Sequence, residues 1–165
     1  MVHKDTISDN KDAFQGVNPS ISDASTYAFS SAQAMIDTFH GKTKHFLYSR
    51  HSSPSNVRLA DEMAKMERSE SAHVFSSGMG AISATLMQLC DQADHIVAAR
   101  TIYGGTHALL KNVFPKWGIT TSFVDITDTE SIENAITAKT RIIYCESLSN
   151  PLLEVADMRK ISRIA

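Results

Sequence analysis

The chain of 165 residues has few cysteines, few prolines, little net charge and no long hydrophobic run. Neither Cys90 nor Cys145 has a C-x-x-C neighbour, which argues against a metal or dithiol motif and favours buried thiols in a reducing compartment. No stretch is apolar enough to span a membrane or to resemble a signal peptide. The net charge of −2 gives no reason to expect nucleic acid or a membrane surface as partner. We therefore expect a cytoplasmic protein, comprising one domain or part of a larger one.

The first third of the chain is predicted to be an arm followed by two helices. Residues 1–31 are polar and sparsely apolar, so we expect an arm that is either mobile or laid on another surface. A short helix is expected at 32–39, ended by Gly41. A second is expected at 54–67, with Ser53 as its cap and Pro54 as its first residue.

From residue 72 onward, short apolar strands alternate with helices. Strands are expected at 73–75, 95–99, 120–124 and 141–145. Helices are expected at 79–90 and from Tyr103 to Val113, where Pro115 stops the second one. A third helix is expected to begin at a capping box of Thr127 and Glu130, with Ile132 and Ile136 facing inward. A last helix is expected from Asp157 onward. This alternation predicts an α/β fold, a mostly parallel sheet with helices on both faces.

One strand-turn-helix stretch, residues 73–82, is typical of a phosphate site. Gly78 and Gly80 let backbone approach a ligand closely, and the start of the helix offers free N–H groups and a positive dipole end. Ser76 and Ser77 add hydroxyl donors. An ordinary tight turn without a ligand is the alternative.

Tyr48 and Arg50 form a second candidate phosphate contact. In an extended segment, residues two apart point the same way, so a phenol and a forked guanidinium would reach out together. The alternative is a loop with a solvated arginine.

Two cofactor classes fit a phosphate site at the carboxyl ends of parallel strands. A dinucleotide needs a third glycine and a following acid, but the chain has Ser83 and Arg100 there. A cofactor with one phosphate and a flat ring needs an aromatic face, which Tyr103 could supply, and a polar group, which Asn150 could supply.

Four motifs occur together in the order and spacing of one family. They are Ser77-Gly78-Met79, Tyr48-Ser-Arg50, Tyr103-Gly104-Gly105-Thr106 and Glu146-Ser-Leu-Ser-Asn150-Pro151. Together they resemble the trans-sulfuration (Cys/Met metabolism) family of pyridoxal-phosphate enzymes, from about residue 15 onward and over the N-terminal part of the family's chains only. The resemblance implies the large domain of a fold type I transferase, with an arm and short helix at 1–50 contacting a neighbouring subunit and the first part of the cofactor domain at 51–165.

The resemblance also implies roles for individual residues. Ser77, Gly78 and Met79 would hold the cofactor phosphate, and Tyr48 and Arg50 would reach the phosphate of a neighbouring subunit. Tyr103 would stack on the ring and assist proton transfer, and Asn150 would hydrogen-bond the ring hydroxyl. The implied enzyme is a homotetramer, a dimer of dimers, acting on small sulfur amino acids, with no metal, nucleic acid or membrane involved.

The chain departs from the family's pattern in three places. Ser53-Pro54-Ser55 replaces Asn-Pro-Thr, and Gly105 stands where methionine γ-lyases carry a cysteine, which argues against that activity. The family's Schiff-base lysine and its ring-nitrogen aspartate would lie beyond residue 165. We therefore expect the 165-residue chain alone to be inactive. A non-catalytic binding or assembly protein, and an NAD(P)-binding half-domain with Arg100 on a 2′-phosphate, are the alternatives.

Overall fold

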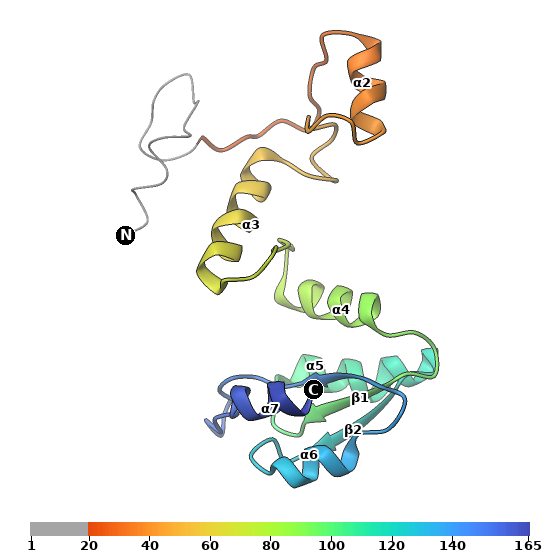
Figure 1. The fold of residues 1–165 in the computed structure, drawn as a ribbon, viewed down its shortest axis with the longest axis vertical. Coiled ribbons are helices and arrows are strands. Elements are labelled where there is room, and N and C mark those ends of the chain that lie inside the picture. The colour runs from red at the N-terminus through yellow and green to blue at the C-terminus, as the bar shows by residue number, and fades with distance from the viewer. Residues whose placement is uncertain (1–19) are drawn as a thin grey trace. The chain divides into compact units, whose positions relative to one another are not determined.

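The computed structural model describes residues 20–165, so predictions that concern residues 1–19 lie outside the described part. The chain divides into two compact units, Met1–Val74 and Phe75–Ala165, which Figure 1 draws as one ribbon. The predicted division into an arm at 1–50 and a cofactor domain from residue 51 stays a prediction.

The first unit contains the two expected helices. Helix α2 spans Ala32–Phe39 and helix α3 spans Pro54–Glu67, which confirms both predicted ranges. The Ser53 side chain accepts a hydrogen bond from the N–H of Asn56, so the predicted cap of α3 is also confirmed. These boundaries were predictable because a serine cap followed by proline is a local signal.

Residues 20–31 lie against residues 45–55 of the same unit. Thr26 forms an antiparallel bridge with Tyr48, and the ring of Tyr27 lies 5.5 Å from that of Phe46. The N–H of Ser22 donates to the Ser55 hydroxyl at 2.8 Å. This part of the predicted arm is therefore laid on its own chain. Its contact with a neighbouring subunit stays a prediction.

The second unit is a three-stranded parallel sheet with helices around it. The strand order is β2-β1-β3. The elements in chain order are α4 (Gly78–Leu89), β1 (His95–Ala99), α5 (Gly104–Ala108), a π-helical turn η1 (Leu109–Val113), a 3₁₀ turn η2 (Phe114–Trp117), β2 (Thr120–Val124), α6 (Thr129–Ala135), β3 (Thr140–Tyr144) and α7 (Met158–Ile164). The predicted α/β class and parallel sheet are confirmed.

Helices cover both faces of this sheet, with α5 on one face and α6 and α7 on the other (Figure 1). The two crossovers leave β1 and β2 in opposite directions along the sheet, so right-handed connections place their helices on opposite faces. Every residue of the central strand β1 is buried. Its apolar residues form one core with Leu110, Phe114, Ile132 and Ile161.

The strand predicted at 73–75, where the first unit ends and the second begins, was wrong. Residues 73–75 are not among the strands of the described part of the chain, because a strand needs a partner that a short apolar run does not reveal. Helix α5 and the π-helical turn η1 together end at Val113, which is the predicted end, and the separate 3₁₀ turn η2 follows directly. Pro115 lies in the first turn of η2. A backbone N–H at that position would have no partner within the turn, so proline is tolerated there.

The cap of α6 lies one residue later than predicted. Asp128, and not Thr127, accepts the hydrogen bond from the N–H of Glu130. Thr127 instead donates to the Asp125 carboxylate. Ile132 is fully buried as expected, but Ile136 ends the helix and is 37% exposed.

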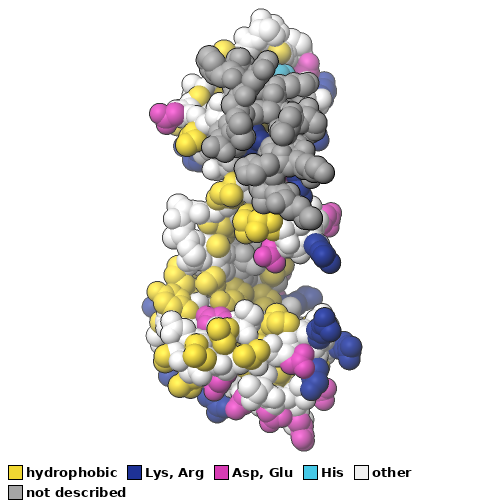
Figure 2. Space-filling model, turned by 90° about the vertical axis from the view of Figure 1, so that its left-hand side faces the viewer, with side chains coloured by type: hydrophobic (Ala, Val, Ile, Leu, Met, Phe, Trp, Pro, Cys, Tyr) yellow, Lys and Arg dark blue, Asp and Glu magenta, His cyan; other side chains and the backbone are white. Residues whose placement is uncertain are grey.

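Some large apolar side chains of both units reach the surface (Figure 2). In the second unit they include Leu89, Leu152, Leu153 and Val155, each more than half exposed. Among the described residues, no helix has the length and apolar character needed to cross a membrane.

Candidate functional site

The start of helix α4 offers backbone donors at its first two residues. The Ser77 side chain caps the helix by accepting a hydrogen bond from the N–H of Gly80 at 3.0 Å. The N–H of Ala81 is bonded to the Ser77 carbonyl. Within residues 20–165, no hydrogen bond uses the N–H of Gly78 or Met79. These two amides are therefore available to an anion at the positive end of the helix.

Gly78 and Gly80 differ in what an added side chain would contact at each position. A Cβ at Gly80 would lie 2.9 Å from the Ser77 hydroxyl oxygen, so a side chain there would disturb the cap. A Cβ at Gly78 would meet nothing within 4 Å, and its backbone has no positive φ. Neither packing nor conformation within the chain requires glycine at 78. Open space beside two available amides fits the close approach of a phosphate.

Tyr103 and Met79 lie beside each other at the head of α5. A Cβ built on Gly105 would lie 2.6 Å from the Tyr103 ring and 3.2 Å from the Met79 sulfur. The Tyr103 side chain is 55% exposed, so one face of an aromatic ring is accessible near the first turn of α4. The structure thus brings together two of the predicted site residues from segments 24 positions apart.

Polar side chains join the carboxyl ends of the three strands. Glu146, just after β3, accepts the backbone N–H of Tyr103 at 2.8 Å. Thr101, just after β1, donates to Glu154. These contacts fix the head of α5 against the segment that follows β3.

The end of β1 is also joined to the end of β2. The Arg100 guanidinium pairs with Asp125 at 3.1 Å, and the backbone N–H of Arg100 donates to Val124. Hydrogen bonds from Thr127, together with the Arg100 charge, lower the pKa of the Asp125 carboxyl. Asp125 is therefore ionised at neutral pH, and it engages the Arg100 charge.

Asn150 lies in a short hairpin after β3. Leu148 and Val155 form its antiparallel bridge, and the buried Ser149 side chain accepts the N–H of Glu154. Asn150 itself is exposed. The interactions that hold this hairpin to the end of β1 come from Glu154, so the predicted role of Asn150 stays a prediction.

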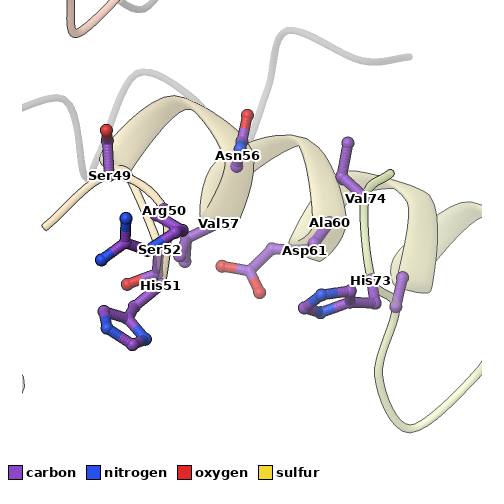
Figure 3. A pocket seen from close by; sticks show the side chains of 11 residues that line it. Ser49, Arg50, His51, Ser52, Asn56, Val57, Ala60, Asp61, His73 and Val74 are labelled. Carbon is purple, nitrogen blue, oxygen red and sulfur yellow. The ribbon is translucent and has the colours of Figure 1, made fainter. Parts of the chain in front are cut away.

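Tyr48 and Arg50 belong to the first unit. The Arg50 guanidinium stacks over the Tyr48 ring at 4.7 Å, so the two side chains meet as expected. The reason differs, because residues 49–51 form a turn in which the N–H of His51 donates to the Tyr48 carbonyl. Arg50 also lines a cleft of about 230 Å³ with His51, Asp61 and His73 (Figure 3).

Sequence reasoning overlooked Glu146, Glu154 and Thr106 as individual site residues. Glu146 and Thr106 lie inside quoted motifs, but their contacts join residues 27 to 43 positions apart, which a spacing pattern does not contain. Burial raises the pKa of the Tyr144 phenol, and a hydrogen bond with the Thr106 side chain partly offsets that rise. Among residues 20–165, no three His, Cys, Asp or Glu side chains gather as metal ligands.

Comparisons with known proteins identify relatives over almost the whole chain. Residues 1–165 match the family model described as Cys/Met metabolism PLP-dependent enzyme. The chain is 44% identical to methionine gamma-lyase of Arabidopsis thaliana over 156 residues, which are 91% of this chain and 35% of that protein. It is 37% identical to cystathionine gamma-lyase of Bacillus subtilis over 125 residues, 76% of this chain and 33% of that protein.

Solved structures show the same fold. A putative O-acetylhomoserine (thiol)-lyase of Campylobacter jejuni, solved with a pyridoxyl-lysine monophosphate, matches with a TM-score of 0.87 and 31% identity. The match covers 93% of this chain and 38% of that one. The chain thus spans little more than a third of the length of the relatives it matches. On the strength of the family model over all 165 residues, the chain belongs to the Cys/Met metabolism PLP-dependent enzymes.

Proposed function

We propose that the chain is part of a pyridoxal-phosphate-dependent lyase or transferase of sulfur amino acids, acting on homoserine esters, cystathionine or methionine. The observation that carries the proposal is the pair of available amides at Gly78 and Met79 beside the exposed Tyr103 ring. Family membership says which anion such a pair of donors is expected to hold.

The first turn of α4 binds the phosphate. The amides of Gly78 and Met79 each donate one hydrogen bond, and the helix dipole favours the negative charge. The Ser77 oxygen already accepts from Gly80, but its own proton remains a possible donor to the same anion. When bound, the cofactor supplies an electron sink for the substrate carbon.

Tyr103 covers the ring and moves a proton through its phenolic oxygen. Its backbone is held by Glu146, so the ring is presented from a fixed helix start while the side chain stays accessible. Asn150 hydrogen-bonds the ring hydroxyl. Both roles rest on the matching positions in the family's motifs.

Tyr48 and Arg50 bind the phosphate of a neighbouring subunit. Their stacking at 4.7 Å pre-orders a phenol and a fork of guanidinium donors for one anion. The proposed assembly is a homotetramer, a dimer of dimers, in which the N-terminal arm contacts the neighbour. The proposed location is the cytoplasm. Assembly and location both follow from the family resemblance.

The proposal includes both substrates of elimination and substrates of replacement. Relatives that match the same region carry the names methionine gamma-lyase and cystathionine gamma-lyase. Gly105 was expected to argue against the first activity, yet several similar relatives bear that name. Elimination and replacement therefore both stay within the proposal.

A titration followed by NMR tests the phosphate site. The ¹⁵N-labelled 165-residue chain is titrated with pyridoxine 5′-phosphate, which has the ring and phosphate but no aldehyde to react with surface lysines. We expect the amide signals of Gly78 and Met79 to shift, and unphosphorylated pyridoxine to leave them in place. Equal shifts with both compounds, or shifts confined to other residues, would contradict the proposal.

Neither alternative from the sequence gains support. A dinucleotide site with Arg100 on a 2′-phosphate needs a guanidinium that Asp125 already engages. A purely non-catalytic role has no observation in its favour.

A further inference from the structure

Thr106 is a fully buried polar residue of α5 that contacts α4. It lies in the first turn of α5, with 0% of its surface exposed. Its hydroxyl donates to the Met79 sulfur at 3.8 Å. A buried hydroxyl needs such a partner, because an unsatisfied one loses its hydration without compensation.

The Met79 side chain lies against the first turn of α5. Thr106 donates to its sulfur. A Cβ built on Gly105 would lie 3.2 Å from the same atom, so the glycine leaves room for the sulfur. The same built Cβ would lie 2.6 Å from the Tyr103 ring. Met79 is therefore fixed against the head of α5 through its side chain, while its backbone N–H is one of the two available donors.

We propose that Thr106 is a positioning residue, whose hydroxyl fixes the Met79 side chain and thereby the first turn of α4 relative to Tyr103. The contacts are a property of the chain alone. Their consequence for ligand binding rests on the proposed function, namely that the amides of Gly78 and Met79 hold a phosphate.

The direction of the effect follows from how α4, α5 and β3 are connected. Glu146 ties the head of α5 to the end of β3, so α5 is a fixed support. Thr106 connects α5 to α4 by its hydrogen bond to the Met79 side chain. Met79 also supplies one of the two available backbone N–H groups. Loss of the hydroxyl leaves α4's first turn with its own cap at Ser77 but with a weaker lateral anchor.

Hydrogen exchange of the ligand-free 165-residue chain tests the positioning role directly. The reporters are the amides of Gly80 and Ala81, which are bonded to Ser77 in the first turn of α4. Thr106→Val keeps the side-chain shape and removes the hydroxyl, and we expect exchange at both reporters to accelerate about threefold to tenfold, the range of one lost hydrogen bond. Thr106→Ser keeps the hydroxyl and is expected to stay near wild type.

Met79→Leu provides an independent variant, because it removes the acceptor sulfur from a half-buried side chain and keeps the backbone amide. We expect it to accelerate the same reporters, and the double variant with Thr106→Val to be no faster than the faster single variant, since both remove one interaction. Unchanged exchange in Met79→Leu, or additive effects in the double variant, would overturn the inference even if Thr106→Val fails to fold.

A second measurement separates this inference from the proposed function. Affinity for pyridoxine 5′-phosphate is measured on the same variants, with an expected loss of about threefold to tenfold for Thr106→Val and recovery in Thr106→Ser. If wild type binds no phosphate compound at Gly78, the proposed function is refuted while the exchange result still decides the positioning role. If wild type binds and Thr106→Val binds equally well, the positioning role is overturned.

Discussion

Replacing Gly78 by alanine is expected to make the chain more stable and its phosphate binding weaker. Helix α4 begins at this residue, its φ is not positive, and an added Cβ meets no atom within 4 Å. Alanine at a compatible position stabilises a protein by about 0.4–1 kcal/mol, mainly because the unfolded chain loses freedom. For a unit of this size, that gain raises Tm by about 2–8 °C.

The same methyl group occupies the space that we assign to the ligand. A phosphate that approaches the Gly78 amide closely must then move away or tilt, which costs at least part of one hydrogen bond to a charged group, about 1.5–3 kcal/mol. That loss corresponds to a fall in affinity of roughly tenfold or more. Stability and binding should therefore change in opposite directions.

The matched control is Gly104→Ala. Gly104 also begins a helix, and its Cβ position is equally open, but no amide of the proposed phosphate site belongs to it. We expect similar stabilisation and unchanged affinity for pyridoxine 5′-phosphate. Thermal unfolding and NMR titration of the three proteins provide both measurements. Unchanged affinity in Gly78→Ala would refute the close approach of a ligand at Gly78.

Three further predictions concern the cap, pH and the cofactor. Ser77→Ala removes the acceptor for the Gly80 amide and should lower the free energy of unfolding by about 0.5–2 kcal/mol in urea titrations, whereas Ser77→Asp, which keeps an acceptor, should not. Burial lowers the pKa of His95, whose ring nitrogens bond to Thr140 and Ser122 on the neighbouring strands. The folded state then binds fewer protons than the unfolded state, so this contribution to stability is complete above pH 6.5 and is lost as the pH falls below it. Urea titrations from pH 7.5 to pH 5 should show a decline in the free energy of unfolding, and the decline should be smaller in His95→Asn. The 165-residue chain treated with pyridoxal phosphate and borohydride should carry no stoichiometric adduct on a single lysine by mass spectrometry, and such an adduct would contradict the expected inactivity.

Local sequence signals predicted the elements well, and contacts between distant segments poorly. The bounds of α2, α3, β1 and β2 were predictable because caps, proline and short apolar runs are written within a few residues. The π turn η1 was not, since it depends on how Leu110 and Phe114 fit the core. Thr127 and Asp128 are both good caps, and only the Asp125 contact decides between them.

The candidate site was predictable in its positions but not in its connections. Order and spacing of four motifs indicated Gly78, Met79 and Tyr103, and the structure places the last two beside each other. The side chains that hold them, Glu146 and Thr106, act across strands and helices that only the fold brings together. A sequence pattern names the residues that face a ligand more readily than those that support them.

The cap formed by Ser77 limits the number of backbone donors that α4 can offer to an anion. The N–H of Gly80 is bonded to the cap, so α4 presents two backbone donors. A phosphate monoester has three terminal oxygens with several lone pairs and can accept more hydrogen bonds than these two. Water supplies the remaining donors in the chain alone, and fixed cations would supply them in the proposed assembly. In the proposed assembly, tight retention of the cofactor would therefore depend on cations from a neighbouring subunit, and the 165-residue chain alone would exchange it freely.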